Sequence, residues 1–199
     1  RNTVPSLIMW GELRGGSVYA YAGGGQQELQ NFQLTPSSNL TGWGAFYSLL
    51  NAANSIIKYA PQVKAKDETY HEGVMNSHIA EAYFMRAWAY FTLVRNFKEV
   101  PLILEPYMTD EHPVDVPKSS ESAIIAQIKE DITTALSSGG AKEFYDDEEW
   151  EGMSKGRVTK WALCALMADV CLWSEDYDGC VKYVEEITES SANFRPVFV

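Results

Sequence analysis

Two tyrosines near the N-terminus, Tyr19 and Tyr21, alternate with small residues in a segment that glycines bracket on both sides. The faces of sugar rings carry apolar C–H groups that stack on aromatic planes, and amide side chains hydrogen-bond sugar hydroxyls. Gln26 follows directly after the second group of glycines and supplies such an amide. Together with Trp43, which lies just beyond the same segment, these residues are our candidates for binding carbohydrate.

A second interpretation is that aromatic residues in loops hold those loops against the helices. It applies to the candidates above and to the other aromatic residues in or beside predicted loops: Trp10, Tyr70, Phe144, Tyr145 and Trp150. For any one of these residues anchoring is the simpler explanation. The sequence therefore leaves open which of them contacts a ligand.

Metal and nucleotide sites lack the spacing that they require. The glycines at 23–25 are not followed by the Lys-Ser or Lys-Thr pair of a phosphate-binding loop. His71, Glu72 and His78 do not place two histidines four residues apart, as a zinc-binding helix must. The acidic run 146–149 lacks the alternating oxygen ligands and central glycine of a calcium loop. We expect no metal site and no cofactor.

Catalytic residues are not indicated either. Asp and Glu together number 27, so carboxylates for glycoside hydrolysis are present in the chain. Nothing in their spacing places two of them across a cleft at the separation of about 5–9 Å that this reaction requires. We therefore predict a protein that is not an enzyme.

The composition is that of an acidic globular chain. It has 199 residues, of which 46% are hydrophobic, and a formal net charge of −11. Such a charge repels phosphate backbones, so we expect no binding to nucleic acid. No uninterrupted apolar run approaches the roughly 18 residues that a membrane-spanning helix needs.

All three cysteines lie late in the chain, at Cys164, Cys171 and Cys180. The first two would be about 10 Å apart along one helix, which is too far for a disulfide. A disulfide between Cys171 and Cys180 across a pair of helices is geometrically open. The simpler prediction is three free thiols that pack as small apolar side chains.

The N-terminal half divides into a loop region and two helices. Residues 1–42 are mixed: the run from Leu7 to Trp10 is compatible with the start or end of a helix, and the glycines and polar residues after it predict a long loop with little regular structure. From Trp43 onward apolar residues recur every three or four positions, which predicts a helix that Thr41 caps and Pro61 ends. After a polar connection, residues 79–96 are apolar on nearly every face, which predicts a buried helix.

The middle of the chain begins with an extended segment. Prolines keep residues 101–118 extended and irregular. A third helix then begins at Ser119 or Ser120, carries isoleucines on one face and stops at the glycine pair 139–140.

Two further helices are predicted at the C-terminal end. Thr159 caps a helix that runs to Trp173, and Asp176 caps another that runs to about Ser190. The short joint between them makes an antiparallel pair, similar to a tetratricopeptide repeat. We predict a mainly α fold of tetratricopeptide-like helical hairpins with long irregular loops, in which residues 43–190 are the helical part.

Three segments in this order resemble one family. The Trp, Tyr and Asn positions of 43–57 resemble its first helix, and Glu81-Ala82, Arg86-Ala87 and the later Val100-Pro101-Leu102 resemble its core. The run Gly156-Arg157-Val158-Thr159-Lys160, with the helix after it, resembles its third motif. The family is SusD/RagB, the surface glycan-binding lipoproteins of bacterial glycan-uptake systems, and the resemblance spans most of residues 40–178.

The resemblance implies a function as well as a fold. It implies that the protein binds polysaccharide or oligosaccharide at the cell surface and delivers it to a TonB-dependent, SusC-like transporter, without catalysis. It also implies an outer-membrane location through an N-terminal lipid anchor that is absent from this chain. Family members are much longer, so we expect residues 1–199 to be a single N-terminal helical domain of a longer protein. The loop before the first helix, residues 15–42, would then hold part of the ligand site.

Two residues depart from the family pattern. Lys98 stands where the family usually has glycine, so either Asn96 takes the left-handed position or the turn differs. Cys180 replaces a small alanine, which should be tolerated. An alternative function also stays open, in which the helical hairpins form a tetratricopeptide-type scaffold for a partner protein and bind no sugar.

Overall fold

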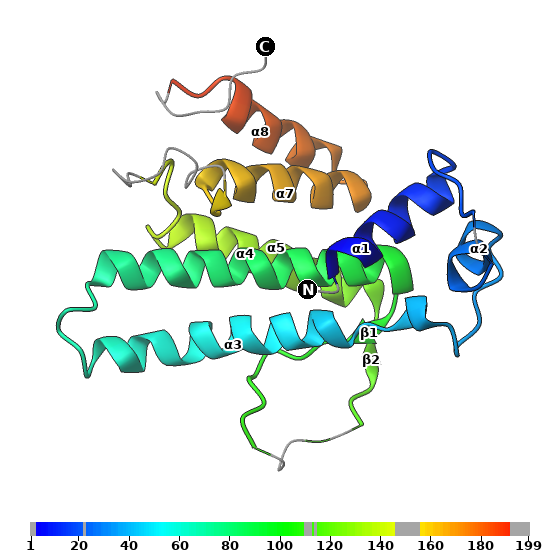
Figure 1. Ribbon diagram of the computed structural model, residues 1–199. Coiled ribbons are helices and arrows are strands. Elements are labelled where there is room, and N and C mark those ends of the chain that lie inside the picture. The colour runs from blue at the N-terminus through cyan, green and yellow to red at the C-terminus, as the bar shows by residue number, and fades with distance from the viewer. Residues whose placement is uncertain (1–2, 22, 110–112, 114, 146–155, 192–199) are drawn as a thin grey trace. The chain divides into compact units, whose positions relative to one another are not determined.

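The computed structural model of this chain describes residues 3–21, 23–109, 113, 115–145 and 156–191 (Figure 1). The chain divides into two compact units, unit 1 (Arg1–Leu49) and unit 2 (Leu50–Val199). The assignment of residues 1–199 to a single domain stays a prediction.

Unit 1 contains short helical turns where the sequence predicted a loop. The helix α1 (Thr3–Ile8) runs on into the π-helical turn η1 (Met9–Leu13), and α2 (Gly25–Gln30) and the 3-10 turn η2 (Asn39–Thr41) follow. Helical structure over Leu7 to Trp10 agrees with the sequence, but the prediction of a loop with little regular structure is wrong at α2 and η2. Gly24 has a φ of +96°, which favours glycine, and directly precedes α2, so the glycine segment leads into a helix.

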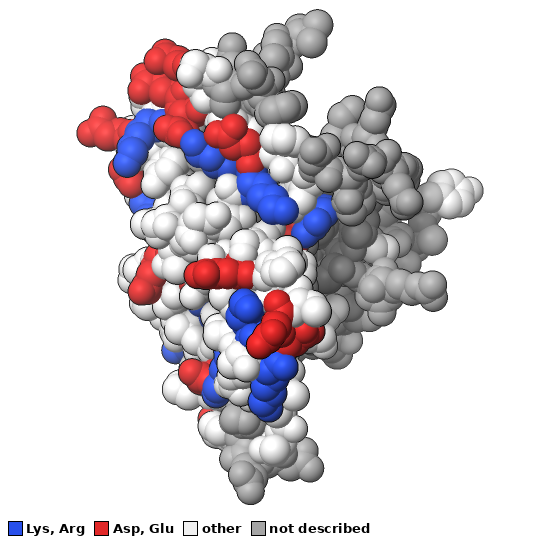
Figure 2. All heavy atoms as spheres, turned by 90° about the vertical axis from the view of Figure 1, so that its left-hand side faces the viewer, with Lys and Arg blue, Asp and Glu red and all other residues white. Residues whose placement is uncertain are grey.

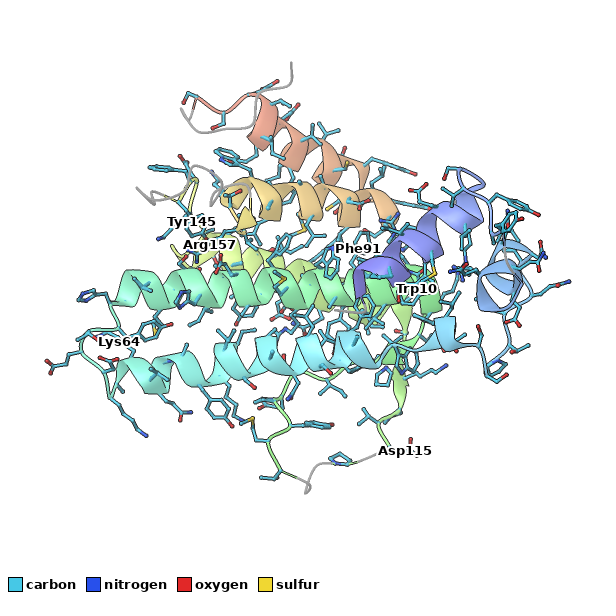
Figure 3. All side chains as sticks on the ribbon, in the orientation of Figure 1. Trp10, Lys64, Phe91, Asp115, Tyr145 and Arg157 are labelled. Carbon is cyan, nitrogen blue, oxygen red and sulfur yellow. The ribbon has the colours of Figure 1, made fainter. Side chains whose placement is uncertain are left out.

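A small apolar core holds the turns of unit 1 together. Trp10 of η1, labelled in Figure 3, stacks on Phe46 at the start of α3 (Gly44–Lys64), with ring centroids 5.7 Å apart. The indole N–H of Trp10 donates to the carbonyl of Leu40 at 2.9 Å. Leu29 of α2 is fully buried, and Ala20 is nearly so.

Unit 2 consists mainly of helices that pack in pairs. It holds the rest of α3, α4 (Glu72–Phe97), α5 (Glu121–Ser137), α7 (Lys160–Trp173) and α8 (Tyr177–Thr188). As Figure 1 shows, α4 packs along α5 and α7 along α8, while α5 also contacts α7. The prediction of a mainly α fold of tetratricopeptide-like helical hairpins is confirmed.

The strands described in unit 2 are two short segments, β1 (Val100–Pro101) and β2 (Lys118–Ser119). They pair antiparallel, with Val100 opposite Ser119. The sequence predicted an extended course between these segments but not that its two ends meet. This pairing closes the long connection from α4 to α5.

The core of unit 2 forms where α4 and α5 meet. Buried side chains occupy most of the circumference of α4, as its apolar composition predicted, but the face that carries Met85 is not buried. From α5, Ile124, Ile128 and Ile132 are fully buried, which confirms the predicted core face of that helix. These isoleucines are spaced four residues apart and so form one stripe.

Most predicted helix caps are confirmed. The Ser120 side chain accepts a hydrogen bond from the Ala123 N–H, Thr159 from that of Ala162, and Asp176 from that of Gly179. Such caps satisfy backbone donors that have no partner inside the helix.

Two predicted boundaries of α3 are wrong. The Thr41 hydroxyl donates to the carbonyl of Ser38 in η2 instead of capping α3, where the carbonyl of Trp43 accepts the first helical bonds. Pro61 lies inside α3, which continues to Lys64. Pro61 lies in the last turn of α3, where a proline costs the helix a single backbone hydrogen bond.

The end of α4 resolves the departure at Lys98. Lys98 itself takes a φ of +63°, and its N–H donates to the carbonyl of Val94 at 2.9 Å. Asn96 stays within the helix, where its side chain donates to the carbonyl of Thr92. With a ψ of −77° and the N–H of Glu99 donating to the carbonyl of Phe97 at 2.9 Å, Lys98 forms a tight turn of a different kind from the left-handed cap, so the turn differs and Asn96 does not take that role.

A buried polar network joins α3, α4 and α5. Arg86 of α4 donates through Nε and Nη2 to the two carboxylate oxygens of Asp131, at 2.8 and 2.6 Å, and through Nη1 to Oδ1 of Asn54 at 3.0 Å. Asp131 and Asn54 are each 1% exposed, and Arg86 is 6% exposed. Gln127 adds a further donor to Asp131 at 2.9 Å. The charges are thus paired and satisfied inside unit 2.

The surface of unit 2 mixes both signs of charge. On the face shown in Figure 2, Lys and Arg side chains alternate with Asp and Glu instead of gathering in a region of one sign. All three cysteines are free thiols. Within the described ranges, no helix is long and apolar enough to cross a membrane.

Candidate functional site

The two candidate tyrosines lie on the surface of unit 1. Tyr19 is 75% exposed and Tyr21 is 98% exposed. Ala20 between them is buried, and its N–H donates to Oε1 of Gln30 on α2 at 3.1 Å. Side chains of an extended segment alternate in direction, so anchoring the alanine leaves both rings in solvent. The rings are therefore available to a ligand at no cost in unpacking.

Gln26 lies in the first turn of α2 and is exposed. Its amide Nε2 lies 3.6 Å from Sδ of Met9 in η1. A thioether is a weak acceptor, so this contact leaves the amide able to bond a stronger partner. Gln26 therefore has the accessible amide that we predicted from the sequence, and it lies in the same unit as the tyrosines.

Trp43 directly precedes α3 and is half-buried. Its ring meets that of Tyr47 edge to face, with centroids 6.1 Å apart. This arrangement fixes the orientation of the indole within unit 1. Trp43 therefore differs from the two tyrosines, whose rings stand in solvent.

Three aromatic residues from the wider set anchor the loops that carry them. Trp10 is 4% exposed and lies in the core of unit 1, and Tyr145 is 7% exposed. Tyr70 is half-buried and stacks on His78 at 5.8 Å. For these three residues the anchoring interpretation holds, whereas Trp150 lies outside the described residues.

Tyr145 belongs to a polar cluster that fastens the loop before α7 to α4 (Figure 3). The guanidinium of Arg157 lies 4.0 Å from the centre of the Tyr145 ring and pairs with both carboxylate oxygens of Glu81, at 3.0 and 2.9 Å. The Tyr145 hydroxyl donates to the carbonyl of Val158 at 2.8 Å. Burial raises the pKa of this phenol. Through Glu81 and Arg157 the cluster joins α4 to the segment that leads into α7.

The histidines considered as metal ligands do not form a metal site. Tyr70 hydrogen-bonds Nδ1 of His78 at 2.9 Å, and His71 precedes α4. Among the residues that the structure describes, no group of three His, Cys, Asp or Glu side chains could hold a metal ion. The acidic run 146–149 lies outside those residues.

An open cleft of about 660 Å³ lies in unit 2 between the start of α5 and the end of α7. Its lining includes Ile125, Lys129 and Trp173, and the indole N–H of Trp173 donates to Glu121 at 2.9 Å. The two sides of this cleft are far apart in the chain, so no local sequence pattern indicates it.

Phe32 is a further exposed aromatic residue that the sequence pattern does not single out. This side chain is 75% exposed, and its backbone has a φ of +56°. A bulky side chain at positive φ is unusual and cannot be recognised from the sequence without knowing where α2 ends. The exposed aromatic residues of unit 1 therefore comprise Tyr19, Tyr21 and Phe32.

The helical hairpins place the chain in the tetratricopeptide-like, mainly α class of proteins. The chain belongs to the SusD-like family, whose model, described as "Starch-binding associating with outer membrane", matches residues 19–172. The resemblance to SusD/RagB that three short motifs indicated is thus confirmed.

Three similar proteins are informative. A SusD-like protein of Bacteroides ovatus is 31% identical over 173 residues, which are 80% of this chain and 29% of the relative. A laminarin-binding SusD-like protein has 26% identity and a TM-score of 0.70, over 85% of this chain and 35% of that one. A crystal structure with xylogluco-oligosaccharide has 27% identity and a TM-score of 0.74, over 91% and 35%. This chain spans less than a third of the length of the curated relatives it matches.

Proposed function

We propose that this protein binds polysaccharide or oligosaccharide at the bacterial cell surface, without catalysis. The observation that carries the proposal is the exposure of Tyr19 and Tyr21, 75% and 98%, on either side of an anchored alanine. Aromatic rings that are exposed to solvent and do not stabilise their own unit by packing are suited to stacking on sugars. Gln26 supplies an amide for hydroxyl groups, and Trp43 is the fourth candidate contact.

Similar proteins support the same class of ligand. One binds laminarin and another is solved with a xylogluco-oligosaccharide, and these are different glycans. The class of ligand is therefore a better inference than any one glycan. Delivery to a TonB-dependent, SusC-like transporter and a lipid anchor in the outer membrane complete the proposal, by analogy with the family.

The proposal is tested by affinity electrophoresis in gels that contain laminarin, xyloglucan or starch. We expect the wild-type protein to be retarded by at least one of them. The double variant Tyr19→Ala/Tyr21→Ala should lose about tenfold or more in affinity, because removing a central aromatic contact typically costs more than ~1 kcal/mol per residue.

Tyr177→Ala is the matched control for this experiment. Tyr177 is also an exposed tyrosine, 61% accessible, but it lies on α8 in unit 2. Its replacement should leave retardation unchanged. Normal mobility of the wild-type protein in every gel, or equal retardation of the double variant, would contradict the proposed site.

A second candidate function, protein binding, is favoured by the outer face of α8. Tyr177, Val181 and Val184 are 61%, 54% and 43% exposed and are spaced as one stripe of a helix. An exposed apolar stripe of this kind is typical of a surface that a partner covers. The proposed transporter is such a partner, so the two functions are compatible.

The double variant Val181→Glu/Val184→Glu separates the two functions. We expect it to lower co-purification with the transporter expressed beside it, because the charges would have to be desolvated at the interface. Glycan retardation should not change. Co-purification at the wild-type level would show that this face of α8 does not bind the transporter.

A further inference from the structure

Phe32 occupies a position at the end of α2 that usually requires glycine. The N–H of Gln33 donates to the carbonyl of Glu28 at 2.7 Å, and the N–H of Phe32 donates to that of Leu29 at 3.2 Å. These two bonds define a Schellman motif, in which the residue after the C-cap adopts a left-handed conformation. Phe32 is that residue, with a φ of +56°.

The conformation is unfavourable for phenylalanine, because Cβ crowds the backbone at positive φ. Glycine avoids this penalty, and asparagine tolerates the conformation better than an aromatic residue. Asn31 stands immediately before Phe32 but has an ordinary φ of −88°. The chain therefore places a phenylalanine where its neighbour would fit better.

Packing does not offset this penalty. The Phe32 side chain is 75% exposed, so it buries little apolar area. Both the exposed apolar ring and the strained backbone lower the stability of the isolated protein. Strain of this kind is typical of residues that a ligand uses.

The segment that carries the two exposed tyrosines is hydrogen-bonded to the end of α2, two residues before Phe32. The side chain of Gln30, the last residue of α2, accepts the N–H of Ala20 at 3.1 Å. The Gln30 side chain thus holds the segment that carries Tyr19 and Tyr21 at the end of α2, and the turn that carries Phe32 follows directly. This hydrogen bond ties the backbone between Tyr19 and Tyr21 to the end of α2, after which Phe32 follows in the chain.

We infer that Phe32 is a third aromatic contact for the saccharide, beside Tyr19 and Tyr21. The inference rests on the proposed function and adds to it the length of the ligand. Three separate rings cannot all stack on one sugar, so the site takes a chain of several sugar units. Because phenylalanine has no hydroxyl group, its contact is with the apolar C–H face of a sugar.

Two substitutions at this position separate binding from stability. Phe32→Asn removes the ring and relieves the backbone, so we expect the melting temperature to stay the same or rise by about 2–4 °C. The same variant should lose about fivefold or more in affinity for the polysaccharide that retards the wild-type protein. Phe32→Tyr keeps both the ring and the strain, and should keep wild-type affinity and melting temperature.

The outcomes distinguish this inference from the proposed function. If Phe32→Asn binds like the wild type while Tyr19→Ala/Tyr21→Ala loses affinity, Phe32 is not a contact but the proposed site stands. A fall in the melting temperature of Phe32→Asn would assign the ring a packing role and would also overturn the inference. If no polysaccharide retards the wild-type protein, the proposed function itself is wrong.

Discussion

Replacing Asp131 with alanine is expected to lower the free energy of unfolding by about 3–5 kcal/mol, the range seen when one partner of a buried ion pair is removed. Asp131 is 1% exposed and accepts two hydrogen bonds from Arg86, at 2.8 and 2.6 Å. Without the carboxylate, the guanidinium of Arg86 would remain buried and would keep Asn54 as a neutral partner. Urea denaturation measures the change, which corresponds to a fall of roughly 10 °C in melting temperature.

The pKa of Arg86 is consistent with this dependence. Burial acts to lower the pKa of the guanidinium, but the hydrogen bonds and charge of Asp131 more than offset it, so the pKa lies above its ordinary value. A raised pKa means that the folded protein favours the charged form, and this contribution would be lost only as the pH rises through that value. Arg86 therefore stays charged at all pH values at which the protein is handled.

Two controls show whether burial is the cause. Glu105→Ala removes an ion pair with Lys58 whose side chains are 47% and 68% exposed, and should hardly change the unfolding midpoint. The double variant Arg86→Met/Asp131→Leu removes both charges together and should be less destabilised than Asp131→Ala. Equal effects of Asp131→Ala and Glu105→Ala would contradict the argument.

Gly140→Ala is expected to destabilise unit 2 by about 3 kcal/mol, at the upper end of the usual cost of overpacking. A Cβ at this position would overlap the carbonyl group of Asn76 in α4 and would lie 2.9 Å from the backbone nitrogen of Ser77. These are backbone atoms inside a helix, so they cannot move aside as the end of a flexible side chain can. The free energy of unfolding in urea is again the measurement.

Gly73→Ala is the matched control for Gly140→Ala. Gly73 lies in the first turn of the same helix, and a Cβ added there meets nothing within 4 Å. Alanine favours a helix more than glycine does, so this variant should be neutral or slightly stabilising. If both alanine variants behaved alike, the close approach of Gly140 to α4 would not be important for stability.

Local patterns predicted most of unit 2. The isoleucine spacing of α5 and the apolar composition of α4 indicated their buried faces, because periodicity reports which side of a helix faces the core. The caps Ser120, Thr159 and Asp176 were also predictable, since each bonds a backbone N–H three positions or so further on. These features depend on neighbours along the chain.

Local patterns did not predict the features that depend on contacts between residues far apart in the chain. Glycines suggested a loop over residues 1–42, but Trp10 reaches Leu40 and Phe46 and holds several helical turns around them. Gly140 looked like part of a helix stop, a role that Gly139 with a φ of +72° performs, whereas Gly140 lets two segments approach. Likewise, the sequence of α4 alone did not predict that Arg86 pairs with residues of α3 and α5.

For the candidate site, the residue types indicated the chemistry of the proposed ligand. The fold determined which of these residues are exposed and can contact it. Tyr19 and Tyr145 are both loop tyrosines in the sequence, but one is 75% exposed and the other 7%. What separates them is contact across the chain: Tyr145 meets Glu81 and Val158, while only the alanine beside Tyr19 is anchored. Burial is a property of the assembled unit, so residue spacing predicted the helices and the resemblance of three motifs indicated the family, whereas three-dimensional packing determined which rings are exposed and revealed Phe32.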